Sequence, residues 1–291
     1  MSTRRSLLSL VSVAAALVTL AGCSLLTTAK SAATDAPTAR PIVGQCWNAT
    51  MTQANNWADW KGPGPTACTL SHVLYTYQVG AISGAAASTW SAPGDSSQLS
   101  AEVQAKAAGA CSISALLPHE KWNQQLISNY FFVPTKAQWK AGARWVRCDL
   151  AVLATGTTLD NESFAALPAK ISSFVRAVAS DPLRFEFCMD SSTPVTESGP
   201  LDNPDAVLAN CKDHPQWKLA LHGKFPDRKG APFPDEATSN AASSKLCLPA
   251  VRGNNEVWIA YLPTKDSWAT DDREIDCWIG QKSAGVSAGT T

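Results

Sequence analysis

Cysteine and histidine are the residues of this chain whose spacing most directly suggests chemistry. The 291 residues include nine cysteines and four histidines. His72 lies four residues after Cys68, and His214 lies three residues after Cys211. A thiolate and an imidazole that lie close together can hold zinc, or can act as a nucleophile and its base. Both roles need free thiolates, so the interpretation depends on whether the cysteines are reduced.

The N-terminal segment has the features of an export signal. Arg4 and Arg5 precede an apolar run from Leu7 to Leu20, which is shorter than the roughly 20 residues that span a bilayer. The run ends in Leu20-Ala21-Gly22-Cys23, which resembles the bacterial lipobox. This resemblance implies that residues 1–22 are a lipoprotein signal peptide and that Cys23 becomes the lipidated first residue. The alternative is an ordinary secretory leader, and the paired arginines leave Sec and twin-arginine export both open.

Lipidation would place the protein on the outer face of the cell membrane, where its acyl chains anchor it. Residues 23–41 are rich in Ala, Thr and Ser, so we expect a flexible tether between the lipid and the folded body. The formal net charge is zero, from 24 basic and 24 acidic residues. We therefore expect no nucleic-acid partner, and a membrane contact that depends on the lipid anchor rather than on charge.

Export also decides the chemistry of the remaining cysteines, because disulfides persist outside the cytoplasm. Eight cysteines follow Cys23 in two groups of four: Cys46, Cys68, Cys111 and Cys148, then Cys188, Cys211, Cys247 and Cys277. Each group allows three pairings. We favour the first with the second and the third with the fourth, which gives Cys46–Cys68, Cys111–Cys148, Cys188–Cys211 and Cys247–Cys277. No thiolate would then remain, so we expect no metal site, no cofactor and no catalytic residue, and histidines that pack beside disulfides.

The sequence before the last cysteine of each group occurs twice. One run begins at Pro134 and ends at Cys148, and the other begins at Pro263 and ends at Cys277. Six positions agree without a gap: Pro134/Pro263, Thr135/Thr264, Lys136/Lys265, Trp139/Trp268, Arg144/Arg273 and Cys148/Cys277. Such a repeat predicts two copies of one module. Because both copies keep the tryptophan and the arginine, we expect a structural role for them, with the arginine capping carbonyl groups of the turn or pairing with an acid.

Hydrophobic periodicity gives both copies the order strand, strand, helix, strand, strand. Strands are predicted for the alternating residues Leu70–Ile82, the Val- and Leu-rich Arg144–Ala154 and Leu183–Met189, and a polar loop for Asn48–Pro65. Leu167, Phe174 and Val178 indicate an apolar helical stripe between the copies. The predicted fold class is therefore α+β, with two tandem small disulfide-stapled modules, each an antiparallel sheet with one main helix. The expected boundaries are 42–156 for the first module, 157–182 for a connecting helix, 183–281 for the second module and 282–291 for a disordered tail.

The cysteine pattern resembles the septum-formation-related domain family of secreted or membrane-attached actinobacterial proteins. The residues that carry the resemblance are Gly44-Gln45-Cys46-Trp47, Cys68 with His72, Cys111, and Trp139 with Gly142, Arg144 and Cys148; in the second copy they are Cys188, Cys211 with His214, Cys247, and Trp268 with Asp272, Arg273 and Cys277. The match covers about Val43 to Gly280. It departs from the family at Ser71, where the family has Pro, and at Ala143, where it has Asp. The resemblance implies a link to division septa and supplies no enzymatic activity.

We expect the residues that carry the function to be among those that the two copies do not share. Trp57 and Trp60, followed by Gly62-Pro63-Gly64-Pro65, occur only in the first copy. These two tryptophans form a possible binding loop for a sugar ring or a partner, unless they fold back and cap the sheet. The chain has no G-x-S-x-G, H-E-x-x-H or P-loop motif. We expect a non-enzymatic binding or structural role in the cell envelope, with a division protein, another envelope protein or a cell-wall polymer as partner. The alternative is an exported cell-wall glycan or peptide hydrolase with an unrecognised acid pair.

Overall fold

The computed structural model describes most of the chain after residue 38. The described residues are 39–56, 60, 62–84, 106–107, 109–117, 126–191, 199–227, 230–269 and 272–281. The signal peptide, Cys23, Trp57 and the tail from residue 282 therefore lie outside the described residues. Within the described residues, no helix has both the length and the apolar character needed to cross a membrane.

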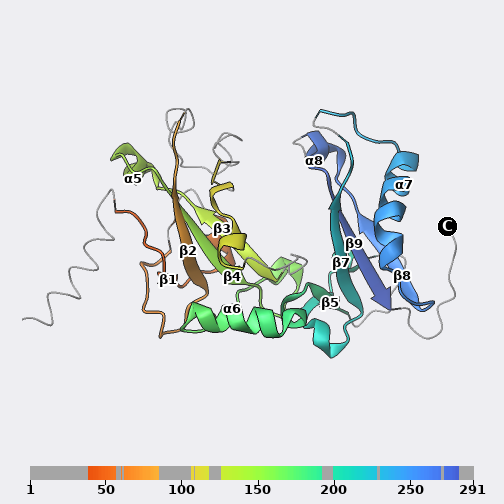
Figure 1. Ribbon diagram of the computed structural model, residues 1–291, viewed down its shortest axis with the longest axis horizontal. Coiled ribbons are helices and arrows are strands. Elements are labelled where there is room, and N and C mark those ends of the chain that lie inside the picture. The colour runs from red at the N-terminus through yellow and green to blue at the C-terminus, as the bar shows by residue number, and fades with distance from the viewer. Residues whose placement is uncertain are drawn as a thin grey trace, which may run out of the picture.

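Two antiparallel sheets form the framework of the molecule (Figure 1). The first sheet has the strand order β1 (Cys46–Trp47), β2 (Leu74–Ala81), β4 (Trp145–Val152) and β3 (Ile127–Phe132). The second has the order β6 (Val207–Ala209), β5 (Cys188–Asp190), β7 (Trp217–Lys224), β9 (Glu274–Gln281) and β8 (Glu256–Tyr261). The predicted α+β class with antiparallel pairing is confirmed.

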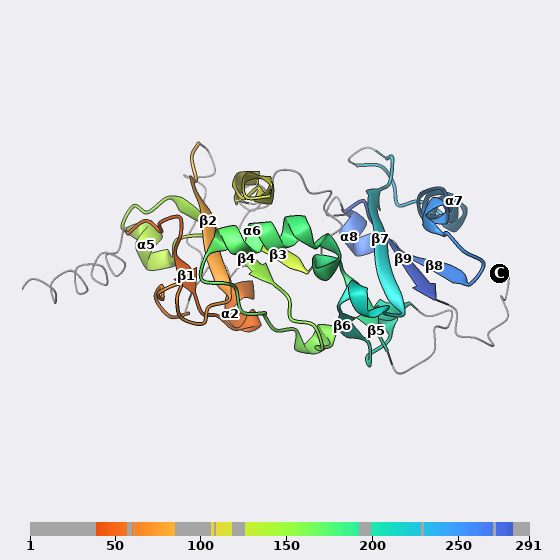
Figure 2. The same ribbon diagram turned by 60° about the horizontal axis from the view of Figure 1, so that its bottom comes forward.

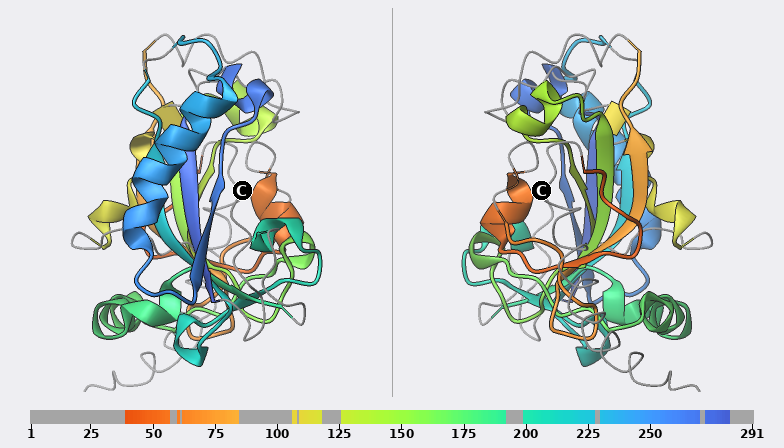
Figure 3. Two further views of the ribbon diagram at one scale, coloured as in Figure 1. Left: turned by 90° about the vertical axis from the view of Figure 1, so that its right-hand side faces the viewer. Right: turned by 90° about the vertical axis from the view of Figure 1, so that its left-hand side faces the viewer.

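Few helices accompany the sheets. The α-helices whose bounds lie within the described residues are α2 (Met51–Asn55), α5 (Lys136–Lys140), α6 (Ile171–Ser180), α7 (Glu236–Cys247) and α8 (Lys265–Ala269). The short 3-10 helices are η2 (Ile113–Ala115), η3 (Leu159–Asn161), η4 (Pro182–Phe185), η5 (Pro200–Asp202), η6 (Cys211–Asp213) and η7 (Leu248–Ala250). In Figure 2, α6 runs along one end of the first sheet and leads toward the second. Helix α7 covers the face of the second sheet that is turned away from the first (Figures 1 and 3).

Local sequence explains where the short helices begin. Thr50 and Thr135 each accept a hydrogen bond from the backbone N–H three residues later, and the glutamine at that position bonds back to the threonine N–H. This reciprocal capping box satisfies two backbone donors at a helix start. It explains α2, which lies in a segment expected to be a loop. Asp235 caps α7 by accepting from the Thr238 N–H.

The two sheets share a bulge at corresponding places. In the first sheet Cys148 pairs with Gln78, and the register shifts between Thr76 and Gln78. In the second sheet Cys277 pairs with Leu221, and the register shifts between Leu219 and Leu221. One extra residue on β2 and one on β7 therefore sits beside the cysteine-bearing strand. The bulge interrupts the regular alternation expected over residues 70–82.

A single apolar cluster extends from one sheet to the other. It includes Leu150 of β4, Val178 of α6, Phe185 of η4, and Leu219 and Trp278 of the second sheet. Backbone hydrogen bonds add to this junction, since the Gly156 N–H donates to the carbonyl of Leu208 in β6. The α-helix between the sheets covers only the last part of the predicted segment 157–182, and β6 was not predicted because a three-residue edge strand leaves little periodicity.

Burial of the tyrosines leads to a pH-dependent prediction. All four tyrosines are described: Tyr75, Tyr77, Tyr130 and Tyr261. Burial raises the pKa of each above the usual 10, to about 12 for Tyr130 and Tyr261. Since the unfolded chain ionises first, the associated stability is present below pH 10 and is lost as pH rises from about 10 toward 12.

We therefore expect the phenolate absorbance at 295 nm to rise at higher pH in the folded protein than in the unfolded chain, with Tyr130 and Tyr261 ionising only near pH 12. The same titration in denaturant should show all the tyrosines ionising near pH 10, which serves as the control. A folded protein that gains phenolate absorbance with a midpoint at pH 10 would contradict this burial.

Candidate functional site

The eight cysteines of the body form four disulfides. The bonded pairs are Cys46–Cys68, Cys111–Cys148, Cys188–Cys211 and Cys247–Cys277, each with Cα atoms 5.3 Å apart. These are the pairs favoured from the sequence. Among the described residues, no group of His, Cys, Asp and Glu is arranged to hold a metal ion. The cysteines therefore offer no thiolate to the two neighbouring histidines.

The histidines near these disulfides lie in different surroundings. His72 is buried, and its Nδ1 lies 2.9 Å from the carbonyl oxygen of Leu70, so this nitrogen carries the donated proton. The expected packing of His72 beside a disulfide stays a prediction. His214 is exposed and adopts the left-handed conformation, with φ of 55°. The two positions share a sequence spacing but not an environment, so they do not form a repeated chemical site.

The repeated tryptophans and arginines form two matching local structures. Arg144 Nη1 donates to the carbonyl oxygens of Trp139 and Ala143, at 2.8 and 2.7 Å. Its guanidinium carbon lies 3.5 Å from the centre of the Trp139 ring. Arg273 makes the same contacts with Trp268 and Asp272. Each arginine thus caps carbonyls at the end of a short helix and stacks on its tryptophan, which is one of the two structural roles expected.

Trp60 folds back onto the first sheet. Its ring meets the rings of Trp47 and Phe132 edge to face, with centroids 5.9 and 4.9 Å away. It therefore caps the sheet, as in the alternative to a binding loop. Trp57 lies outside the described residues, so its part in the expected binding loop stays a prediction.

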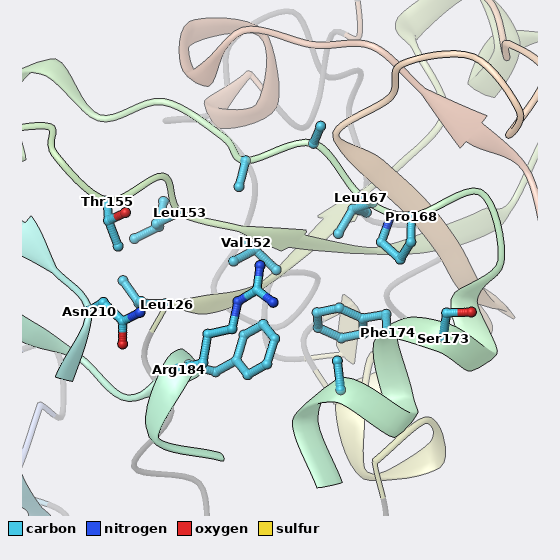
Figure 4. Close-up of a pocket in the computed structure, with 14 residues that line it drawn as sticks. Leu126, Val152, Leu153, Thr155, Leu167, Pro168, Ser173, Phe174, Arg184 and Asn210 are labelled. Carbon is cyan, nitrogen blue, oxygen red and sulfur yellow. The ribbon is translucent and has the colours of Figure 1, made fainter. Parts of the chain in front are cut away.

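A pocket lies at the junction of the two sheets (Figure 4). Its volume is about 500 Å³, which falls within the range of roughly 300–1,000 Å³ that is common for small-molecule sites. The end of β4, residues 165–168, α6 and η4 supply most of its walls. Apolar side chains dominate, among them Val152, Leu167, Phe174 and Phe185. Such a pocket suits the apolar body of a ligand.

One cation reaches into this apolar pocket. The Arg184 side chain extends between Val152 and Phe174 in Figure 4, and its guanidinium carbon lies 5.7 Å from the centre of the Phe185 ring. Arg184 makes no ion pair with the described residues. Thr155, Ser173 and Asn210 add polar groups to the lining. The arrangement combines an apolar cavity with one positive charge, which is complementary to a ligand with an apolar body and one anionic group.

Two further pockets could hold the pair of carboxyl groups expected of a glycan hydrolase. One, of about 700 Å³, lies beside His214 and the Cys188–Cys211 disulfide, and Glu256 is the carboxylate in its described lining. The other, of about 200 Å³, lies on the outer side of the first sheet and has no carboxylate in its described lining. The described lining of the junction pocket has none either. None of the three pockets therefore has two carboxyl groups in its described lining.

The sequence did not predict the junction pocket. Leu167, Phe174 and Val178 indicated an apolar helical stripe, but nothing marked Arg184 as the charge beside it. The position of Arg184 depends on η4, a 3-10 helix formed by residues that were expected to begin a strand. Pro182 starts this helix, where its fixed φ is favourable. The signal available was a proline directly before the segment Leu183-Arg184-Phe185.

Comparison of the chain with protein-family models, with curated proteins and with solved structures found no match. The resemblance to septum-formation-related domains rests on the residues quoted above. The function is therefore inferred from the geometry of the sites.

Proposed function

We propose that this chain is an exported lipoprotein on the outer face of the cell membrane, where it binds a ligand or partner without catalysing a reaction. The observation that carries the binding role is the junction pocket, with its apolar walls and the Arg184 guanidinium. The leader and the Cys23 lipobox support export and anchoring. The four disulfides are typical of a protein that folds in an oxidising compartment.

The proposal includes two copies of one stapled module. The order β1-β2-β4-β3 corresponds to β5-β7-β9-β8, and the bulge has the same relation to the cysteine-bearing strand in both sheets. The Arg144 and Arg273 contacts also correspond. In this arrangement α6 and η4 connect the modules and form the pocket between them. The resemblance to septum-formation-related domains adds a role in division, with an envelope or division protein or a cell-wall polymer as partner.

The ligand class follows from the pocket lining. Apolar side chains favour a hydrocarbon or similar body, and the exposed guanidinium of Arg184 at the edge of the pocket favours a carboxylate or phosphate at one end. We therefore propose an amphiphilic anion as the ligand of the junction pocket. A protein anchored at a membrane surface is well placed to meet such molecules.

Labelled palmitate should enter the protein in cells and should be lost in Cys23→Ala. The reason is that Cys23 is the one cysteine outside the four disulfides. Cys23→Ala should also move the protein from the membrane fraction to the soluble fraction. Thiol titration of the purified lipidated protein in denaturant should find no free cysteine. Label that persists in Cys23→Ala would contradict the proposed anchoring. A free thiol among the eight cysteines after Cys23 would contradict the disulfide framework.

Octanoate should bind the protein measurably more tightly than octanamide, and Arg184→Gln should weaken octanoate roughly tenfold. A hydrogen bond to a charged group contributes about 1.5–3 kcal/mol, and a tenfold change corresponds to about 1.4 kcal/mol. Isothermal titration calorimetry gives the affinities. Arg176→Gln is the matched control, because Arg176 is exposed on α6 and does not line the pocket.

Equal affinities of the wild type and Arg184→Gln for octanoate would contradict the assignment of the pocket. So would a loss of binding of the same size in Arg176→Gln, since that result would show a general effect of surface charge. Octanamide affinity should be the same in all three proteins, because the amide carries no charge for Arg184 to recognise.

A further inference from the structure

A second site lies on the outer side of the first sheet, away from the junction pocket. Its centre is Arg147 of β4, which is only 2% exposed. The guanidinium carbon of Arg147 lies 4.0 Å from the ring centre of Trp47, 4.6 Å from that of Trp60 and 4.2 Å from that of Phe132. A buried cation enclosed by three aromatic rings is strongly fixed in position.

Arg147 is paired with a fully buried carboxylate. Its Nε lies 2.9 Å from Asp149 Oδ2. The Thr76 hydroxyl donates to Asp149 Oδ1 at 2.7 Å, and Trp47 Nε1 donates to the Thr76 hydroxyl at 2.9 Å. Burial lowers the pKa of Arg147 and raises that of Asp149, and the attraction between the two charges opposes both shifts. This chain of polar contacts holds the guanidinium from one side.

In the second sheet apolar residues replace three members of this polar network, whereas Asp276, which bonds to His222, stands at the position of Arg147. Thr76 pairs with Asp149 next to the bulge, and Leu219 pairs with Trp278 at the corresponding place. Trp47, the residue after the first cysteine, corresponds to Met189. Leu219, Trp278 and Met189 are all buried. Since apolar residues of similar volume often stabilise a fold as well as a buried ion pair does, the network in the first sheet calls for a role beyond packing.

Two donors at this site have no acceptor among the described residues: Arg147 Nη2 and Trp145 Nε1, both buried. Both side chains come from β4, two residues apart, and so share one face of the strand. Both also line the same pocket. A buried donor without an acceptor is unfavourable, so a ligand that supplies acceptors here gains affinity by removing that cost.

The pocket limits what this ligand can be. Its volume is about 200 Å³, and Trp47, Trp60, Pro63 and Pro65 form much of its wall. This is smaller than the roughly 300–1,000 Å³ of most sites for drug-sized molecules, so it accepts a small terminal group. The described lining contains two arginines, Arg40 and Arg147, and no carboxylate. The site therefore favours a negatively charged group that offers two acceptor atoms.

We propose that this pocket, the Arg147 pocket, binds a single carboxylate, either a small free carboxylate or the C-terminal carboxylate of a peptide. One oxygen accepts from Arg147 Nη2 and the other accepts from Trp145 Nε1, while the apolar walls surround the adjoining methyl or methylene group. Asp149 is bound through Nε, and because Nη2 carries two N–H groups, one of them remains for the ligand.

The test compares N-acetylalanine, N-acetylalaninamide and acetate as probes, with the Trp145 indole N–H resonance in a ¹⁵N–¹H spectrum as the readout. Trp145→Phe assigns the resonance. N-acetylalanine should move it and should bind at least tenfold more tightly than the amide. Acetate separates the sources: affinity equal to that of N-acetylalanine supports a small free carboxylate, whereas weaker binding supports a peptide terminus.

Variants make the result specific. Arg147→Met combined with Asp149→Leu removes the donor together with its buried partner and leaves no unpaired charge, so the protein should fold but lose at least tenfold in affinity. Arg184→Gln should leave this affinity unchanged, which separates the Arg147 pocket from the junction pocket. The proposal is overturned if acid and amide bind equally or if the double variant folds and binds normally.

Discussion

Replacing Asp149 by asparagine is expected to lower the free energy of unfolding by about 3–5 kcal/mol, the usual result of breaking a buried ion pair. Asp149 is fully buried, and its carboxylate lies 2.9 Å from the Arg147 guanidinium. The amide keeps the shape of the side chain but leaves Arg147 as an uncompensated buried charge. Urea unfolding with the disulfides intact gives the free energy, and the loss would be a large part of a typical stability of 5–15 kcal/mol.

The double variant Arg147→Met and Asp149→Leu is the control for this prediction. It removes both charges, so its stability should lie much closer to that of the wild type than to that of Asp149→Asn. At the register position of Asp149, the second sheet has the buried Trp278 beside Leu219, so an apolar residue is accepted there; Asp276 stands at the position of Arg147. A double variant as unstable as Asp149→Asn would show that the ion pair itself, rather than an unpaired charge, decides the stability of this face.

Replacing Cys111 and Cys148 together by alanine is expected to cost about 3–4 kcal/mol. The disulfide closes a loop of 37 residues and fixes the segment before η2 onto β4. Its loss gives the unfolded chain more freedom, and both sulfurs leave positions that are almost fully buried. Chemical unfolding under non-reducing conditions measures the change.

The Cys46–Cys68 pair provides a comparison, because it closes a shorter loop of 22 residues and Cys68 is partly exposed. The corresponding double alanine variant should lose less stability than Cys111→Ala with Cys148→Ala. Equal unfolding midpoints of the wild type and the Cys111–Cys148 variant would contradict the stapling role of this bond.

The sequence predicted the features that depend on residues close together in the chain. The alternating apolar residues of β2 and the Val- and Leu-rich β4 indicated strands, and the two runs ending at Cys148 and Cys277 indicated matching turns. Export and the even number of body cysteines indicated disulfides, and the nearly equal first intervals of 22 and 23 residues favoured the pairing. A structural role for Arg144 and Arg273 followed from their presence in both runs, with carbonyl capping and pairing with an acid both open.

The sites could not be predicted because they depend on packing between distant segments. Arg147 and Asp149 alternate along β4, and such charges in a strand normally indicate an exposed face. Here Trp47 and Trp60 cover that face from segments about 90 to 100 residues earlier in the sequence. The junction pocket likewise forms only when α6 and η4 meet the end of β4.

Photo-crosslinking tests most directly whether this anchored chain binds an amphiphilic anion at the junction of its two sheets. The probe is a decanoate that carries a diazirine, added to cells that express the wild type, Arg184→Gln or Arg176→Gln, with modified peptides mapped by mass spectrometry. The predicted result is modification in the membrane fraction of peptides from the end of β4, α6 and η4, strongly reduced in Arg184→Gln and unchanged in Arg176→Gln. Modification confined to other segments, or equal in all three proteins, would contradict the account.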